Sequence, residues 1–151
     1  MNKNIEKILF KVTGDLVYDK KVLERIFEET MYNYRIVEIV HGSGTQISEA
    51  LNKANINFEY VNGIRKTTPG GLKIAFKVSD SIRSYLEQQF MGKVKVYSPL
   101  TMQGNEIINT NSDEIVKKIC HQYDKIYVCT KNGRDKRELS KLPNLEVLYF
   151  E

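Results

Sequence analysis

Lysine, glycine and aspartate residues lie at the end of the first predicted strand of this chain and could meet an anion. Lys11 lies near the end of the apolar stretch 8–12 and is followed by Thr13, Gly14 and Asp15. Burying an ammonium group is costly unless an opposite charge accompanies it, and a phosphate would serve. The alternative is a lysine whose stem lies along apolar surface while its charged end reaches water.

A second group is the glycine-rich segment His-Gly-Ser-Gly-Thr-Gln-Ile at residues 41–47. Glycines let the backbone approach a ligand closely, and the first N–H groups of a following helix favour an anion. Ser43 and Gln46 also have the spacing of a capping box, so the segment alternatively only begins a helix. It is neither a P-loop, because no Gly-Lys-Ser/Thr follows, nor a dinucleotide fingerprint, because Ile47 stands where a third glycine belongs.

A third group, Asn-Thr-Asn-Ser-Asp at residues 109–113, precedes a predicted helix. A calcium loop is excluded because Glu114 replaces the required glycine and Cys120 replaces the closing glutamate. One alternative is simple N-capping by Thr110, Asn111 or Ser112, with Asp113 complementing the helix dipole. Arg65 lies just after Asn62-Gly63, and beside a ligand it would clamp a carboxylate, whereas on an exposed hairpin it is only solvated.

The elements that must position these groups alternate between strands and helices. This order predicts a parallel or mostly parallel sheet covered on both faces, with ligands gathering beyond the carboxyl ends of the strands. Asn62-Gly63 between two extended runs predicts a hairpin. The predicted strands are 8–12, 35–40, 58–61, 64–67, 94–97, 106–108, 126–129 and 145–150, and the predicted helices are 22–31, 47–54, 72–90 (divided near Ser79), 115–120 and a short one from about 136.

Composition places the chain among ordinary globular proteins. Its 151 residues are 41% hydrophobic and 28% charged. These values predict one domain and exclude a disordered chain, a fibre and a coiled coil. No apolar run approaches the length of roughly 20 residues that spans a bilayer. Residues 1–6 carry acid and amide where a signal peptide needs apolar residues. We therefore expect a cytoplasmic protein that does not enter a membrane.

Metal and nucleic-acid sites receive little support from the sequence. The two cysteines, Cys120 and Cys129, are not in a Cys-x-x-Cys motif, and with only two histidines they predict reduced core thiols and no metal site. The net charge of +4 is concentrated in residues 117–141, where eight basic and three acidic residues give +5. This basic segment could meet phosphates, but solvated charge is the commoner explanation, and nucleic acid ranks last among the partners.

Taken together, the motifs resemble one family. Lys-Val-Thr-Gly-Asp (11–15), Val-His-Gly-Ser-Gly-Thr-Gln-Ile (40–47), Phe-Glu-Tyr-Val-Asn-Gly-Ile-Arg-Lys-Thr (58–67) and Asn-Thr-Asn-Ser-Asp (109–113) occur in the order found in the amino-acid kinase superfamily. The second and third segments resemble N-acetylglutamate kinase most, and the first is more like uridylate kinase. The resemblance implies an α/β fold, a three-layer sandwich with a mostly parallel sheet of the carbamate-kinase-like, amino-acid-kinase type, truncated at its C-terminal end.

The resemblance also implies roles for the matching residues. Acetylglutamate kinases transfer phosphate from ATP, with magnesium, to a side-chain carboxylate. On the matching positions, Lys11 would stabilise the phosphoryl group while Asp113 orients the lysine. The implied substrate-binding residues are Gly14, Gly42, Gly44, Arg65 and Asn109, and the implied nucleotide-binding residues are Thr130 and Lys131.

Several positions depart from the family pattern. Thr13 and Ser43 replace glycines of the family, and Thr45 replaces a proline. The chain ends about twenty residues after Thr130, so most of the family's nucleotide-binding half has no counterpart here. We therefore expect a single domain over 1–151 that is the acceptor-binding half, with a short remnant of the nucleotide half from about 124.

Three functions follow as hypotheses. The first is a minimal kinase for an N-acylated amino acid or similar small carboxylate, with Lys131 or Arg134 replacing the second lysine of the family. The second is a non-catalytic binding or regulatory protein, a pseudokinase, that forms a homodimer or pairs with a chain supplying the missing half. The third, a nucleic-acid-associated protein that uses the basic segment, would show steep salt dependence of binding.

Overall fold

The computed structural model describes residues 4–151, so the first half of the stretch 1–6 used in the signal-peptide argument lies outside the described residues. Its centre is a five-stranded sheet in the order β5-β2-β1-β8-β9, and every strand pairing in it is parallel. Parallel strands need crossover connections, and helices provide most of them here. The sheet consists of β1 (Glu6–Val12), β2 (Arg35–His41), β5 (Lys95–Tyr97), β8 (Lys125–Lys131) and β9 (Leu145–Phe150).

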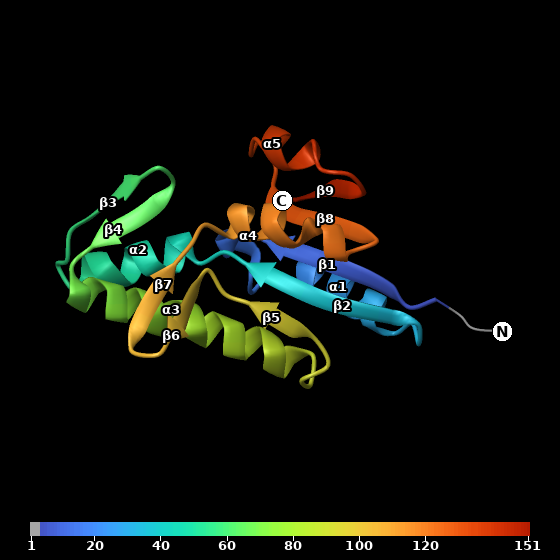
Figure 1. The fold of residues 1–151 in the computed structure, drawn as a ribbon, viewed down its shortest axis with the longest axis horizontal. Coiled ribbons are helices and arrows are strands. Elements are labelled where there is room, and N and C mark those ends of the chain that lie inside the picture. The colour runs from blue at the N-terminus through green and yellow to red at the C-terminus, as the bar shows by residue number, and fades with distance from the viewer. Residues whose placement is uncertain (1–3) are drawn as a thin grey trace.

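Apolar side chains cover both faces of this sheet because successive residues in a strand point to opposite sides. Ile8 and Phe10 of β1 pack with α1 and the second half of α3 on one face, whereas Leu9 packs with α4 on the other. Figure 1 shows the helices on either side of the strands. The helical elements beside the sheet are η1 (Gly14–Leu16), α1 (Lys20–Thr30), α3 (Pro69–Gln89), α4 (Ser112–Ile119), η2 (Cys120–Gln122) and α5 (Arg137–Ser140).

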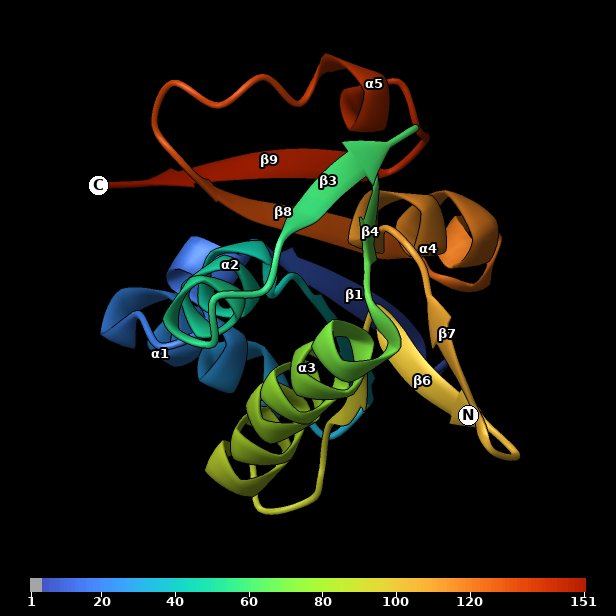
Figure 2. The same cartoon turned by 90° about the vertical axis from the view of Figure 1, so that its left-hand side faces the viewer.

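A smaller lobe lies beyond the carboxyl ends of β1 and β2, where both strands point in Figure 1. In it Ile47 and Leu51 of α2 pack against Ala75 of α3 and Leu100 of β6. Two antiparallel hairpins, separate from the central sheet, form its outer part, and Figure 2 looks at the molecule from this side. The lobe contains α2 (Gly44–Lys53), the first half of α3, and the hairpins β3 (Phe58–Val61) with β4 (Ile64–Thr67) and β6 (Leu100–Gln103) with β7 (Glu106–Asn109).

The predicted hairpin at Asn62-Gly63 is confirmed. Both residues have positive φ angles, 51° and 77°, which is the backbone that a tight two-residue turn of this kind requires. The second hairpin turns at Gly104, with φ 61°, and its first strand, β6, is absent from the elements that the sequence predicts.

The predicted division near Ser79 is wrong, because α3 is one helix of 21 residues. Ser79 is fully buried and its hydroxyl lies 2.7 Å from the hydroxyl of Ser98 and 3.1 Å from that of Ser43. The serine therefore satisfies its hydroxyl through tertiary contacts, and the helix continues past it. None of the helices in residues 4–151 is long and apolar enough to cross a membrane.

Candidate active site

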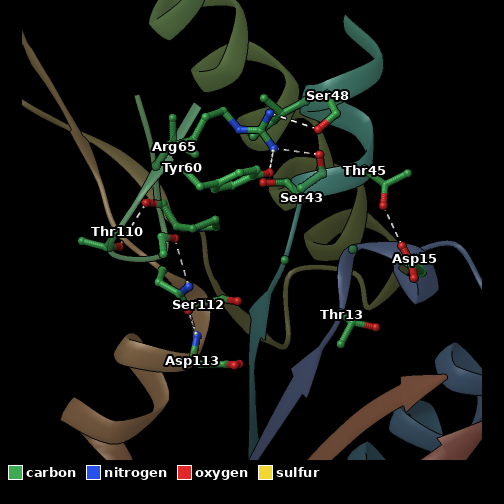
Figure 3. A pocket seen from close by; sticks show the side chains of 18 of the residues that line it. Thr13, Asp15, Ser43, Thr45, Ser48, Tyr60, Arg65, Thr110, Ser112 and Asp113 are labelled. Carbon is green, nitrogen blue, oxygen red and sulfur yellow. Dashed lines mark hydrogen bonds between the residues drawn. The ribbon is translucent and has the colours of Figure 1, made fainter. Parts of the chain in front are cut away.

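A cleft of about 700 Å³ opens at the carboxyl ends of β1, β2 and β8, between the central sheet and the hairpin lobe. This is the sheet edge at which the sequence predicts a ligand. Figure 3 shows side chains from both sides of the molecule pointing toward this space. The predicted site residues that line it are Lys11, Gly14, Gly42, Gly44, Arg65, Asn109, Asp113 and Thr130.

Lys11 and Asp113 form an ion pair at the floor of the cleft. Lys11 lies on the face of β1 that α4 covers, and its ammonium is 3.2 Å from the Asp113 carboxylate. The Asn111 side chain caps α4 by accepting a hydrogen bond from the Asp113 N–H, so one of the predicted caps is present. The cap fixes the first helical turn, and this turn holds Asp113 against Lys11.

The two groups have shifted pKa values. Burial lowers the pKa of Lys11, and the attraction of Asp113 offsets only part of this effect. Burial alone would raise the pKa of Asp113, but the charges of Lys11 and Lys136 outweigh it, and the pKa of this carboxyl is lowered. Asp113 therefore stays ionised and provides the charge that a buried ammonium requires.

Lys136 is a site residue that the sequence analysis did not single out. Its ammonium lies 3.6 Å from the other carboxylate oxygen of Asp113, so one carboxylate serves two lysines. Lys131, predicted to bind nucleotide, is exposed and does not line the cleft. The only signal for Lys136 was its place in the basic segment 117–141, because the turn around it carries no periodic pattern.

The glycines let two loops press against each other. A Cβ on Gly42 would lie 2.9 Å from the backbone nitrogen of Gly14, and a Cβ on Gly14 would lie 3.2 Å from that of Ser43. The capping box, which was the alternative for Ser43 and Gln46, is absent, since Ser43 makes no side-chain cap and Gln46 donates to the Gly14 carbonyl at 2.7 Å. Glycine at these positions therefore allows close backbone approach.

Arg65 projects from β4 into the cleft. Its guanidinium donates to the Ser48 hydroxyl and the Gly44 carbonyl, each at 3.0 Å, and to the Tyr60 hydroxyl at 2.5 Å. It also stacks over the rings of Phe58 and Tyr60, 4.4 and 4.9 Å from their centres. Figure 3 shows Arg65, Ser48 and Tyr60 converging. Arg65 is only 8% exposed, and burial lowers its pKa.

Asn109 supports this arrangement from the second hairpin. Its amide donates to the backbone carbonyl of Arg65 at 3.0 Å. Asn111 similarly reaches the Gly63 carbonyl at 3.3 Å. These bonds join the two hairpins, so the amide of Asn109 both lines the cleft and fixes the strand that carries Arg65.

Asp15 closes another side of the cleft. Its carboxylate accepts hydrogen bonds from the Thr45 hydroxyl at 2.6 Å and from Arg134 at 2.8 Å. The Thr45 hydrogen bond is the main reason that the pKa of Asp15 is lowered, and Arg134 adds to it. Figure 3 shows the hydrogen bond between Thr45 and Asp15. The contact with Arg134 ties the loop after β8 to the loops after β1 and β2.

Two buried hydroxyl groups have no hydrogen-bond partner within residues 4–151. They belong to Thr13 and Thr130, which follow β1 and end the buried part of β8, and both residues line the cleft. Unpaired buried hydroxyls cost free energy, so a ligand that accepts their hydrogen bonds would stabilise the protein. Over the same residues no group of three or more His, Cys, Asp or Glu side chains is placed to hold a metal.

Known proteins similar to this chain are acetylglutamate kinases, although no known protein-family model matches it. The enzyme of Bacillus licheniformis is 36% identical over 81 residues, which are 52% of this chain and 31% of that protein. The enzyme of a Geobacillus species is 28% identical over 118 residues, 66% of this chain and 45% of that protein. The chain is therefore related in sequence to acetylglutamate kinases, as its motifs predict, and spans less than half of their length.

Solved structures with a similar fold carry other names. N-acetylglutamate synthase from Neisseria gonorrhoeae, complexed with coenzyme A and L-arginine, has a TM-score of 0.64 at 11% identity, over 88% of this chain and 45% of that one. The smu.665 protein of Streptococcus mutans has a TM-score of 0.63 at 14% identity, over 85% of this chain and 76% of that one. At such identities the likeness concerns the fold alone.

This comparison corrects the predicted fold class. The expected carbamate-kinase-like, amino-acid-kinase sandwich is wrong as an assignment, because the similar solved structures are those of N-acetylglutamate synthase and the smu.665 protein. The physical reason is that the motifs at 11–15, 40–47, 58–67 and 109–113 are short segments around the cleft. Such segments report the chemistry of a site, whereas a fold depends on strand order and on packing across the whole sheet.

Proposed function

We propose that the cleft binds an N-acylated amino acid or a similar small carboxylate, with N-acetylglutamate as the first candidate. The sequence relatives are named acetylglutamate kinase, and one of the structures with a similar fold is an N-acetylglutamate synthase complexed with N-acetyl-glutamate. The cleft has a volume of about 700 Å³. This size lies within the usual range for small-molecule sites.

The environment of Arg65 is the observation that carries this proposal. Within residues 4–151 no acidic side chain lies within ion-pair distance of its guanidinium, and its hydrogen bonds go to two hydroxyls and one carbonyl. A buried cation with only neutral partners lacks the charge that would offset its desolvation. A ligand carboxylate would supply that charge, and a guanidinium binds a carboxylate through paired hydrogen bonds.

Isothermal titration calorimetry with N-acetylglutamate tests the proposal. Arg65→Lys keeps a positive charge but loses the planar group, so we expect affinity to fall at least about tenfold. Arg137→Lys is the matched control because Arg137 is exposed and pairs with Asp135 outside the cleft, and its affinity should equal that of the wild type. Absence of heat with the wild-type protein, or equal affinity in both variants, would contradict the proposal.

Phosphorylation of the bound carboxylate by ATP is the second candidate. Lys11 and Lys136 on one carboxylate, beside the hydroxyls of Thr13 and Thr130, form a basic group that would stabilise the charge of a transferred phosphoryl. In this hypothesis Lys136 replaces the second lysine of the family, a role that the sequence suggested for Lys131 or Arg134. Magnesium bound to ATP would take most of its ligands from phosphates and water, because Asp15 and Asp113 already lie against basic groups.

A coupled assay of ADP release with N-acetylglutamate separates the two candidates. Turnover that is lost in both Lys11→Met and Lys136→Met would support phosphoryl transfer. Binding of N-acetylglutamate without ADP release would leave the protein as a carboxylate-binding or regulatory chain, including one that pairs with another chain for its nucleotide site. Nucleic-acid binding is not favoured, because Arg134 and Lys136 of the basic segment turn to Asp15 and Asp113 in the cleft.

A further inference from the structure

A short polar segment between β8 and α5, residues 132–136, borders the cleft through Arg134 and Lys136, and we call it the strap. Its sequence is Asn-Gly-Arg-Asp-Lys, so it contains no apolar side chain. The chain is anchored on either side of it, because Thr130 of β8 and Leu139 of α5 are buried. Residues 132–135 are exposed, and the backbone turns at Gly133 with a φ angle of 85°. Packing therefore fixes the two ends of the strap and leaves its middle to charged contacts.

Two ion pairs hold the strap to separate walls of the cleft, in the position that we call closed. A guanidinium nitrogen of Arg134 lies 2.8 Å from the carboxylate of Asp15, and the Lys136 ammonium lies 3.6 Å from that of Asp113. Figure 3 shows Asp15 and Asp113 apart, on either side of Thr13. The Arg134 side chain is 62% exposed, so salt screens its ion pair, which adds little stability. The contact that closes the middle of the strap is therefore weak.

The closed strap brings a second ammonium group to Asp113. This carboxylate already faces Lys11, so one negative charge serves two lysines. The buried hydroxyls of Thr13 and Thr130, which also line the cleft, have no hydrogen-bond partner within residues 4–151. An anion beside Lys136 would supply a second negative charge and accept hydrogen bonds from these hydroxyls. Such a ligand binds the closed strap better than the open one, and this difference in affinity shifts the equilibrium toward the closed position.

We propose that the strap is a lid that opens to admit an anionic ligand and closes on it, with the Arg134–Asp15 pair as its latch. The latch is a property of the chain alone, whereas the closing step rests on the proposed function. N-acetylglutamate carries two carboxylates, so one can face Arg65 while the strap closes on the other through Lys136. The strap therefore selects a ligand with two carboxylates over a ligand with one. Loops that close on a bound substrate in this way commonly move within microseconds to milliseconds.

Trypsin digestion of the full chain without ligand tests the latch. Trypsin binds the side chain after which it cleaves in a specificity pocket, so cleavage after Arg134 requires this side chain to leave Asp15. Asp15→Asn keeps an acceptor for the Thr45 hydroxyl and every trypsin site but removes the charge, and cleavage after Arg134 should be about fivefold faster than in the wild type. Asp80→Asn is the matched control, because Asp80 pairs with Arg83 at the same distance of 2.8 Å but does not line the cleft, and its cleavage rate should equal that of the wild type. Circular dichroism checks that each variant is folded.

Digestion with ligand tests the closing step. Saturating N-acetylglutamate should slow cleavage after Arg134 at least about tenfold in the wild type, whereas N-acetylglutamine, which has an amide in place of the second carboxylate, should slow it much less. Equal cleavage of the wild type and Asp15→Asn without ligand would overturn the latch. Calorimetric binding of N-acetylglutamate without slower cleavage would overturn the closing step. If N-acetylglutamate does not bind at all, the proposed function and the closing step both fail, whereas the digestion without ligand still decides the latch.

Discussion

The ammonium of Lys11 at the end of β1 lies 3.2 Å from the carboxylate of Asp113 in the first turn of α4. This pair joins two elements that are distant in the sequence, and it does so at the floor of the cleft. A buried ion pair adds little net stability, because desolvation opposes the attraction, but it is sensitive to the loss of one partner. The two residues should therefore respond differently to substitution.

Asp113→Asn leaves the Lys11 ammonium buried without its full counter-charge. We expect the free energy of unfolding to fall by about 3 kcal/mol, at the lower end of the effect for buried pairs because Asp113 is partly exposed. Lys11→Met removes the charge that needs a partner, and its stability should stay within about 1 kcal/mol of the wild type. Urea denaturation at pH 7 measures both, and equal losses in the two variants would contradict this account.

Gly42 and Gly44 differ in what a methyl group would meet. In Gly42→Ala the new Cβ lies 2.9 Å from the Gly14 backbone nitrogen, so the two loops must separate. We expect this to cost about 1–3 kcal/mol. In Gly44→Ala the nearest atom is a guanidinium nitrogen of Arg65 at 3.9 Å, and alanine favours the first turn of α2. The midpoint temperature of thermal unfolding should be equal to that of the wild type or slightly higher in Gly44→Ala. A Gly42→Ala protein as stable as the wild type would contradict this prediction, because the two loops would then separate without cost.

The sequence predicted that several site residues lie at one edge of the sheet, because the carboxyl ends of parallel strands meet there. Lys11 and Thr130 belong to neighbouring parallel strands whose carboxyl ends share an edge, and Gly42 follows a third strand there. The Asn62-Gly63 turn likewise predicted the hairpin that carries Arg65, since few residue pairs adopt that backbone. The catalytic and binding roles of these residues stay predictions.

Other features depend on contacts that no local pattern encodes. Lys131 follows Thr130 in β8, and alternation along the strand sends its side chain away from the cleft. Lys136 reaches Asp113 only because the loop after β8 folds back over the sheet edge. The pattern around Ser79 predicts a helix break, whereas the buried partners of this serine come from distant segments. The assignment to the amino-acid-kinase fold was wrong because it was inferred from short motifs around the cleft, whereas the mostly parallel α/β sheet, predicted from the alternation of strands and helices, is present.

The serine chain provides a test within α3. Ser79→Ala leaves the buried hydroxyls of Ser43 and Ser98 without their shared partner. We expect the free energy of unfolding to fall by about 1–3 kcal/mol. Ser81→Ala on the same helix is the control, because Ser81 is exposed. A surface change of this kind should alter stability by at most about 0.5 kcal/mol. If urea denaturation gives the same stability for both variants, the hydroxyl chain contributes nothing.

His41 makes the stability of the protein depend on pH. Its ring is fully buried at the end of β2, where Nδ1 lies 2.9 Å from the Gly42 carbonyl, and burial lowers its pKa to about 4, helped by the charges of Arg83 and Lys11. The unfolded chain binds a proton below about pH 6.5 while the folded chain does not, so the contribution of His41 is complete above about 6.5 and is lost as pH falls toward 4. The free energy of unfolding should therefore drop by about 3 kcal/mol over this window. His41→Asn removes the titrating group. Urea denaturation at pH 7 and pH 4.5 should therefore show a much smaller drop in the free energy of unfolding in this variant than in the wild type. Equal drops in the two proteins would mean that other groups cause the acid sensitivity.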